Sequence, residues 1–221
     1  YGDELLDLAG KAEDFMGYAI KPDGNCATYG DTLLADYKNC SYIDENSVLA
    51  YVSNKWNKNV KTQEFEPEKI IAYPESGYFI CREFWDNKNE DNLQYEDATW
   101  LLFKSGYTKI THKQADDNSF SLYSRGHDIF VDCGMYNYMY RNPIRHYVRT
   151  ANAHNLVIAD ETSFEFLRED LKNRCGIAYS YIDDTVGYVI GYNCLYHGIL
   201  MLRHLIFCKN SVFILDEIES N

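Results

Sequence analysis

The spacing of hydrophobic residues changes near residue 67, and this change divides the 221-residue chain into two parts of different secondary structure. Before Pro67, apolar side chains recur at the i, i+3, i+4 and i+7 positions that mark amphipathic helices. We expect helices over residues 5–19, 32–37 and 46–56. A turn is expected at residues 22–25, where Pro22 and Gly24 end the first helix. Residues 1–72 are therefore predicted to be helical.

After Pro67 the apolar segments are short, rich in aromatic and β-branched residues, and separated by Gly, Asn or Asp, as β-strands are. The expected strands cover residues 78–81, 99–103, 119–123, 128–132, 155–159, 177–182, 187–192, 200–208 and 212–218. A hairpin turn is expected at 125–128 and a helical turn within 164–171. Strands at this spacing predict a β-sandwich over residues 73–221, so the fold class is α+β, mainly β.

Both parts look incomplete, because the helical pattern begins abruptly and the last strand is followed at once by the end of the sequence. We interpret the sequence as an internal fragment of a longer protein. It contains no apolar run of the ~18 residues that a transmembrane helix requires.

The formal charge of the chain is −13, from 34 acidic and 21 basic residues. This charge argues against general binding of nucleic acids or anionic membranes. Taken alone, it also argues against a polyanionic substrate. However, the acidic residues are unevenly distributed, because residues 133–159 contain none. A local basic surface can still hold an anion, since contacts within about one Debye length (~8 Å) outweigh distant net charge.

The seven cysteines are scattered, without a CxxC pair, so their spacing does not predict a structural zinc site. We interpret them as reduced residues, most of them in the core. A reducing compartment suits such cysteines, so a cytoplasmic location stays open.

Arginines and tyrosines interleave in the acid-free stretch, at Arg141, Arg145, Arg149, Tyr136, Tyr138, Tyr140 and Tyr147. Guanidinium groups bind carboxylates or sulfates through paired hydrogen bonds, and tyrosine offers a sugar ring both a flat apolar face and a hydroxyl. Arg145, Arg149 and Tyr138 are thus candidates for substrate binding. The alternative is that chance and a buried strand explain the stretch, with the tyrosines acting as strand residues.

Three further polar residues lie at the ends of expected strands. His112 precedes one strand, Asp132 ends the next, and His154 opens a later one. Two imidazoles and a carboxylate at strand ends can converge on one point and form a reactive site. The alternative is that each histidine is a hydrogen-bonded structural residue.

Three motifs in this region resemble, in the same order, those of the heparinase II/III-like polysaccharide lyases. The matching stretches are residues 112–126 (HKQADDNSFSLYSRG), 131–138 (VDCGMYNY) and 147–155 (YVRTANAHN). Residues 22–24 with 30–31 also resemble the last toroid segment of the family, 74–78 the start of its β domain, and 203–217 a later strand pair. The resemblance covers most of the chain.

The resemblance implies an antiparallel β-sandwich preceded by the last helices of an α/α toroid, with the substrate cleft between them. Family members cleave uronic-acid polysaccharides by β-elimination. A tyrosine and histidines share the proton transfers, and an amide or a histidine neutralises the substrate carboxylate. The implied partners are an acidic polysaccharide and the upstream toroid domain of the same protein. The family also implies a periplasmic or secreted location.

The resemblance assigns roles to individual residues. His112 and Tyr136 correspond to residues of the catalytic cleft, and Arg149 to the arginine of the third motif. Asp132 and His154 correspond to two of three zinc ligands. The third ligand position holds Gln114, and an amide oxygen is a poor zinc ligand compared with imidazole. We therefore expect no tightly bound zinc.

Cys133, next to Asp132, does not replace the missing ligand, because neighbouring strand residues point to opposite faces. The catalytic tyrosine and carboxylate-neutralising residue of the family lie upstream, so this chain alone is expected to be inactive. Two alternatives remain at this point. One is a non-catalytic carbohydrate-binding or capsule-processing relative that has lost the metal site. The other is a structural sandwich without a ligand.

Overall fold

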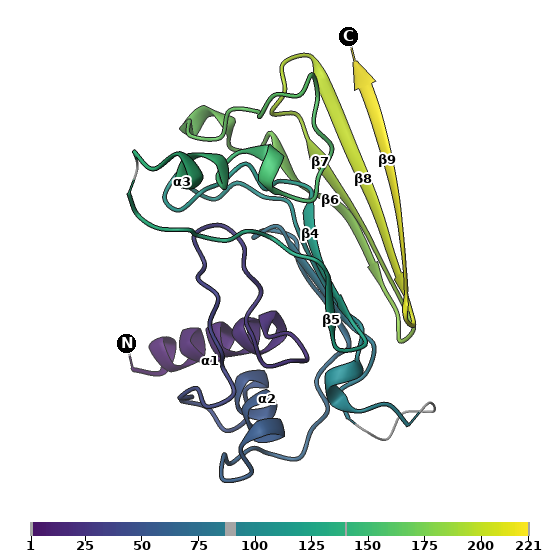
Figure 1. Ribbon diagram of the computed structural model, residues 1–221. Coiled ribbons are helices and arrows are strands. Elements are labelled where there is room, and N and C mark those ends of the chain that lie inside the picture. The colour runs from purple at the N-terminus through teal and green to yellow at the C-terminus, as the bar shows by residue number, and fades with distance from the viewer. Residues whose placement is uncertain (1, 87–91, 140, 221) are drawn as a thin grey trace.

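The computed structural model describes residues 2–86, 92–139 and 141–220. Figure 1 shows helices α1 (Gly2–Ala19) and α2 (Val48–Trp56) on one side of a sheet, and a second sheet on its other side. The first sheet contains β1 (Ile70–Tyr73), β2 (Tyr78–Arg82), β3 (Trp100–Lys104), β4 (Ser119–Ser124) and β5 (His127–Phe130). The second contains β6 (Cys175–Ile182), β7 (Val186–Asn193), β8 (Ile199–Cys208) and β9 (Ser211–Ser220). Neighbouring strands in both sheets are antiparallel and consecutive in the chain.

The first and third expected helices are confirmed as α1 and α2. Helix α2 begins where Ser47 caps it, because the Ser47 hydroxyl accepts a hydrogen bond from the Ala50 amide at 3.1 Å. An Asp14 carboxylate oxygen of α1 accepts from the Val48 amide at 2.9 Å and so joins the two helices. The buried Glu13 carboxylate accepts from the Ile43 and Asp44 amides in the connecting segment.

The expected helix over residues 32–37 is wrong, because this segment is extended. Its backbone pairs with the turn after α1 instead. The Cys26 amide donates to the Ala35 carbonyl at 3.1 Å, and the Tyr37 amide donates to the Gly24 carbonyl at 2.9 Å. Six residues give less than two helical turns, so these tertiary hydrogen bonds decide the backbone conformation.

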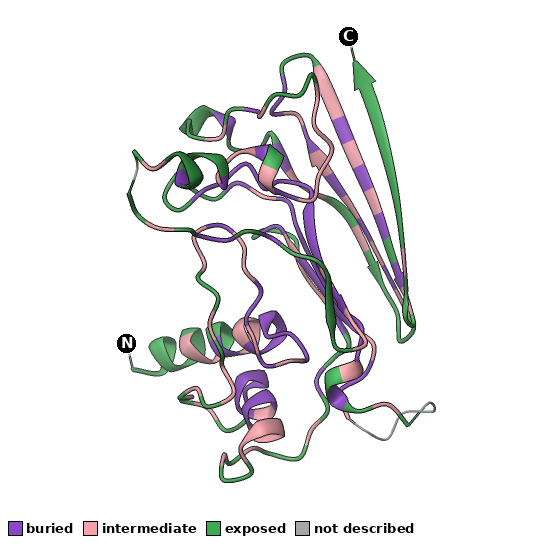
Figure 2. Cartoon of the chain, viewed as in Figure 1, coloured by how far each residue is buried: buried purple, intermediate pink, exposed green. Residues whose placement is uncertain are grey.

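The central strands β2 and β3 of the first sheet are buried on both faces, whereas the edge strand β5 is exposed (Figure 2). On β3, Trp100 and Leu102 pack against the helices, whereas Leu101 and Phe103 pack against the second sheet. A strand covered on both sides reads as a continuous apolar run rather than as an alternating one. This explains the sequence WLLFK of β3.

The second sheet completes the sandwich and is covered on one face only. Along β7 buried and partly exposed residues alternate, as expected when one face meets the core. Val189, Leu205 and Phe207 pack against the first sheet. The antiparallel β-sandwich is therefore confirmed, and so is the hairpin turn at 125–128 between β4 and β5.

The expected strand over 155–159 is wrong, because this segment is irregular. Its apolar residues Leu156–Ala159 pack against a third core cluster, and the Asn155 amide donates to the Phe120 and Val131 carbonyls. One strand and three short helical elements in the described residues were not expected from the sequence. They are β1, the helix α3 (Pro143–Tyr147), which Asn142 caps, and the 3-10 turns Tyr95–Asp97 and Ala151–Ala153. The helical turn expected within 164–171 is a 3-10 turn at Glu169–Leu171.

All seven cysteines lie in the described part of the chain and none forms a disulfide. Within the described ranges, no helix is both long and apolar enough to span a membrane.

Candidate functional site

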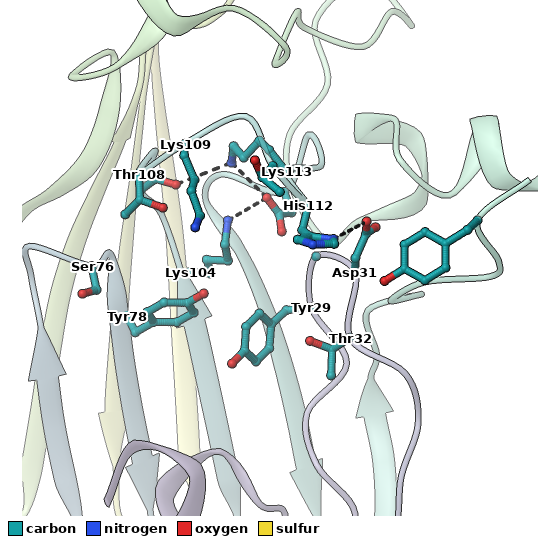
Figure 3. A pocket seen from close by; sticks show the side chains of 15 residues that line it. Tyr29, Asp31, Thr32, Ser76, Tyr78, Lys104, Thr108, Lys109, His112 and Lys113 are labelled. Atoms are coloured by element: carbon teal, nitrogen blue, oxygen red, sulfur yellow. Dashed lines mark hydrogen bonds and ion pairs between the residues drawn. The ribbon is translucent and has the colours of Figure 1, made fainter. Parts of the chain in front are cut away.

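A pocket of about 580 Å³ lies where the extended segment after α1 meets the loop between β3 and β4 (Figure 3). Tyr29–Thr32 of the segment form one wall, and residues 108–113 of the loop form another. Tyr138 also lines the pocket, from the chain that follows β5. The pocket therefore lies between the N-terminal part of the chain and the sandwich.

His112 lies at this pocket and has a solvent-exposed ring, with 57% of its side chain accessible. Its Nδ1 lies 3.0 Å from Asp31 Oδ2, and its ring packs edge-on against Tyr138 with 6.3 Å between the ring centroids. The backbone φ of His112 is 60°, a left-handed conformation that is uncommon outside glycine. The structure thus brings together two residues that the sequence singled out, His112 and Tyr138.

The Asp31 carboxylate connects the pocket to two further candidate residues. Gln114 Nε2 donates to Asp31 Oδ1 at 3.0 Å, and Arg145 Nη2 lies 2.7 Å from Oδ1 and 2.8 Å from Oδ2. Burial raises the pKa of the Asp31 carboxyl, but the hydrogen bonds from Gln114, Arg145 and His112 outweigh burial and lower the pKa below its ordinary value. Arg145 is 2% exposed and faces Asp31 rather than open solvent.

A buried network of two lysines and two aspartates supports the loop that carries His112. Lys104 Nζ lies 2.7 Å from Asp116 Oδ1, and Lys113 Nζ lies 3.0 Å from the same oxygen and 2.6 Å from Asp117 Oδ2. Burial raises the pKa of Asp116, but the charges of Lys104 and Lys113 outweigh burial and hold the pKa well below its ordinary value. The network neutralises its own charges and fixes the loop to β3.

The pocket also contains groups that the sequence did not indicate. Lys109 is exposed at the pocket (Figure 3), and among the described residues no acidic side chain pairs with it. Tyr29 and Tyr78 form part of the wall, and burial raises the pKa of both hydroxyls, which keeps them protonated. A cation beside hydroxyls and an imidazole can bind an anionic sugar and exchange a proton with it.

Asp132 and His154 form a separate buried pair. His154 Nδ1 lies 2.7 Å from Asp132 Oδ2, and Asp132 Oδ1 accepts from the Gly134 amide at 2.9 Å. Burial lowers the pKa of His154, but the hydrogen bond and charge of Asp132 outweigh burial and raise it above the ordinary value. The pair does not line the pocket that contains His112.

At the implied zinc position an amide stands in place of the third imidazole, which makes a weak ligand set for zinc, although Gln114 Oε1 and His154 Nε2 are buried there without a hydrogen-bond partner among the described residues. Both Asp132 oxygens already accept hydrogen bonds, and Gln114 turns its amide nitrogen toward three acceptors, namely Asp31 Oδ1 and the carbonyls of Gly30 and Gly134. In the described ranges, no three His, Cys, Asp or Glu side chains gather as metal ligands would. Cys133 is exposed and donates to the Ala153 carbonyl, whereas Asp132 is buried.

The remaining candidates lie outside the pocket wall. Tyr136 is 50% exposed in the segment after β5. Arg149 donates from Nη2 to the Lys113 carbonyl at 3.3 Å, and its guanidinium lies 5.3 Å from the Phe166 ring centroid. Arg149 therefore contacts the backbone of the loop that carries His112 without lining the pocket. Tyr140 lies outside the described residues.

Two antiparallel sheets packed as a sandwich, with helices against one sheet and a pocket where the two parts meet, define this chain as a mainly β protein of the antiparallel β-sandwich class. The family profile "Heparinase II/III-like, C-terminal" matches residues 66–221. The chain therefore belongs to the heparinase II/III-like family.

Individual relatives agree with this assignment. The chain is 24% identical to a heparin-sulfate lyase of Bacteroides stercoris over 219 residues. The aligned region covers 96% of the chain and 31% of that protein. Its fold is similar to a solved heparinase III with methylated lysines, with a TM-score of 0.77 and 20% identity over 98% of the chain and 32% of that protein. It is also similar to the heparan sulfate lyase HepC of Pedobacter heparinus, with a TM-score of 0.70 and 17% identity over 91% of the chain and 31% of that protein. The chain thus spans about a third of the length of these relatives.

Proposed function

We propose that this chain is the sandwich part of a polysaccharide lyase that cleaves a uronic-acid-containing polysaccharide by β-elimination. The names of its relatives favour a heparan sulfate-type glycosaminoglycan as substrate. In this proposal residues 1–72 are the end of an α/α toroid and residues 73–221 belong to the sandwich. The single observation that carries the proposal is the pocket in which an exposed imidazole lies beside Tyr138 and an unpaired lysine.

The reaction needs a group that moves a proton at the sugar ring. A base takes the C5 proton, the electron pair of that bond forms the C4–C5 double bond, and the C4–O bond breaks with its pair on the leaving oxygen, which takes up a proton. His112 is the candidate for one of these transfers, because its Nδ1 faces Asp31 and its ring is open to solvent. Tyr136 is the second candidate catalytic residue.

Substrate binding is assigned to side chains around this imidazole. Tyr138 offers its ring face to a sugar, and Lys109 supplies a positive charge for a carboxylate or sulfate. Arg149 and Arg145 contribute to substrate binding indirectly. Arg149 contacts the loop that carries His112, and Arg145 contacts the Asp31 carboxylate. The tyrosine and the carboxylate-neutralising residue that the family uses belong, in this proposal, to an upstream part of a longer protein. The chain alone therefore binds the polysaccharide without cleaving it.

The test compares this chain with a longer protein that contains it. With heparan sulfate, the longer protein produces the ultraviolet absorbance of unsaturated uronate, and His112→Ala lowers this rate at least 100-fold. The 221-residue chain produces no such absorbance but binds heparan sulfate oligosaccharides in calorimetry, whereas it does not bind neutral dextran. Full activity of the His112→Ala lyase, or absorbance produced by the chain alone, contradicts the proposal.

A second candidate function is a non-catalytic carbohydrate-binding relative that retains the fold. The glutamine at position 114 favours it, because an amide replaces an imidazole at the family's metal position and is a poorer zinc ligand. In that case the longer protein binds heparan sulfate but produces no unsaturated uronate.

A further inference from the structure

One carboxylate, that of Asp31, receives side-chain donors from two separate parts of the sandwich domain. His112 and Gln114 reach it from the loop before β4, and Arg145 reaches it from α3. The three donors are 81, 83 and 114 residues away from Asp31 in sequence. The Asp31 side chain is only 7% exposed, so these partners replace most of its contact with water.

We propose that Asp31 is the positioning residue of His112, and that Gln114 and Arg145 hold the Asp31 carboxylate in place without a metal ion. The inference rests on the proposed function only in that His112 transfers a proton during the reaction. The orientation of the imidazole does not depend on that function, because it follows from the contact between His112 and Asp31.

The contact with Asp31 determines the tautomer of His112. A carboxylate only accepts hydrogen bonds, so the Nδ1 that lies 3.0 Å from Asp31 Oδ2 carries a proton. In the neutral ring Nε2 then has the free electron pair. Because the ring is exposed at the pocket, Nε2 is the nitrogen that can exchange a proton with a bound sugar.

The neighbours of Gln114 determine the orientation of its side-chain amide. Its nitrogen faces three acceptors, the Asp31 carboxylate and the Gly30 and Gly134 carbonyls, at 3.0, 2.7 and 3.3 Å. The opposite orientation would place the amide oxygen against three other oxygens, so the nitrogen must face Asp31. A residue at the family's metal-ligand position therefore ties the two walls of the pocket together in this chain.

Arg145 and a close approach of the two pocket walls also hold Asp31 in place. Arg145 Nη2 lies within 2.8 Å of both Asp31 oxygens and is buried, so it fixes the carboxylate and balances its charge. Gly30 has a φ of 52°, and a Cβ at this position would lie 3.2 Å from the His112 carbonyl oxygen. The backbones thus meet tightly at the point where Asp31 contacts His112.

The test reads the imidazole itself, by long-range proton–nitrogen NMR of the histidine-labelled 221-residue chain at alkaline pH. Comparison with His112→Gln assigns the His112 signals among the six histidines. We expect the Nδ1–H tautomer in the original chain and a shift toward Nε2–H in Asp31→Asn. In that variant an amide nitrogen replaces one carboxylate oxygen. This nitrogen donates hydrogen bonds and cannot accept them from His112, Gln114 and Arg145. The matched control is Asp36→Asn, which changes an exposed carboxylate in the same segment that interacts with Lys38 and does not line the pocket.

Two internal readouts separate positioning from unfolding. His204, whose Nδ1 lies 2.6 Å from the Tyr188 hydroxyl on the second sheet, keeps its signals if the fold is intact. Adding equimolar zinc or a chelator leaves the His112 signals of the original chain unchanged, because no metal holds this imidazole. An unchanged His112 tautomer in Asp31→Asn, or a zinc-dependent His112 signal, overturns the inference.

The kinetic arm uses the longer lyase. Asp31→Asn is expected to lower kcat about 10- to 100-fold with little change in KM, since a misoriented base affects the reaction more than binding. Restoration of activity by Asp31→Glu supports positioning. If the tautomer changes in Asp31→Asn but His112→Ala leaves kcat intact, the proposed function of His112 fails and the orientation by Asp31 stands. If His112→Ala abolishes kcat but Asp31→Asn does not lower it, the positioning inference fails.

Discussion

At the scale of single residues, the pocket combines groups that lie far apart in sequence. His112 and Tyr138 were predicted from motifs and strand ends, and the structure places both at one pocket. Asp31 was noticed only as part of a segment that resembles the family, because nothing in its sequence neighbourhood indicates an imidazole 81 residues away. Such a pair depends on the tertiary fold, so local sequence patterns do not predict it.

Arg145 illustrates a second limit of prediction from sequence. Arginine in an acid-free stretch indicates an anion site, but the sequence does not say whether the anion is a substrate or a carboxylate of the same chain. Here the buried guanidinium meets Asp31. The lysine that is open to a ligand, Lys109, lies outside the acid-free stretch.

Replacing Lys109 tests whether its charge contributes to polysaccharide binding. Lys109→Ala is expected to weaken binding of heparan sulfate oligosaccharides about fivefold, which corresponds to ~1 kcal/mol for an exposed charge pair. The loss is expected to shrink as salt concentration rises, because salt screens exposed charges. Calorimetric titrations at two salt concentrations measure both effects.

The matched control for this prediction is Lys61→Ala, which removes an exposed lysine that does not line the pocket and leaves the net charge equal to that of Lys109→Ala. Equal weakening by the two variants would show that only net charge matters and would contradict a role for the pocket.

At the scale of secondary-structure elements, periodic segments were predicted well and short irregular ones were not. Helix α1 and the long strands of the second sheet carry enough periodic residues to be recognised. The segments 32–37 and 155–159 are apolar as well, but their backbone groups or side chains find partners elsewhere in the fold. Tertiary contacts override local propensity in segments this short.

The turn between β4 and β5 carries an ion pair with Glu83, which lies directly after β2. Arg125 donates from Nη1 to Glu83 Oε2 at 2.6 Å and from Nη2 to Oε1 at 2.9 Å. Burial raises the pKa of Glu83, but hydrogen bonds from Arg125 and Thr99 outweigh burial and lower the pKa below its ordinary value. The paired geometry holds the turn that leads to β5 and to the segment after it.

This ion pair predicts a dependence of stability on pH. A carboxyl with a depressed folded pKa stabilises the fold above its unfolded pKa of ~4.3, and the stabilisation is lost as the pH falls through the folded value. Glu83→Gln is thus expected to lower the free energy of unfolding by about 1 kcal/mol at pH 7, because Arg125 is partly exposed and solvent screens the pair. The difference from the original chain narrows below pH ~4, where the original Glu83 also becomes protonated.

Urea unfolding at a series of pH values measures this difference. Glu75→Gln, at an exposed position on the turn between β1 and β2, serves as the control and is expected to follow the original chain at every pH. A Glu83→Gln difference that stays constant down to pH 3 would contradict the assignment to this carboxylate.

At the scale of the whole molecule, the sequence predicted the antiparallel sandwich with preceding helices, but not that the first sheet is covered on both sides. The continuous apolar run of β3 is the signal that could have predicted this double coverage, since such strands are typical of sheets buried on both faces. The pocket lies at the edge of this three-layer arrangement, where the N-terminal segment reaches the irregular chain after β5. Thr28 Oγ1 donates to the Asp132 carbonyl at 2.6 Å, and the Met135 amide donates to the Thr32 carbonyl at 3.0 Å. The geometry of the site therefore depends on how the N-terminal part packs against the sandwich.

The packing of the two sheets leads to a prediction about Gly191 of β7. A Cβ at this position would overlap with Asn118 Oδ1 in the loop before β4 and with the ring of Phe103 in the first sheet. Gly191→Ala is therefore expected to lower the free energy of unfolding by about 1–3 kcal/mol, as overpacking of a closed interface does. The matched control is Gly10→Ala in α1, where the nearest atom to the added Cβ is 3.7 Å away and alanine is expected to stabilise the helix by about 0.5–1 kcal/mol. Chemical denaturation of both variants checks the prediction, and equal stability changes of the same sign would show that the two sheets do not pack tightly at Gly191.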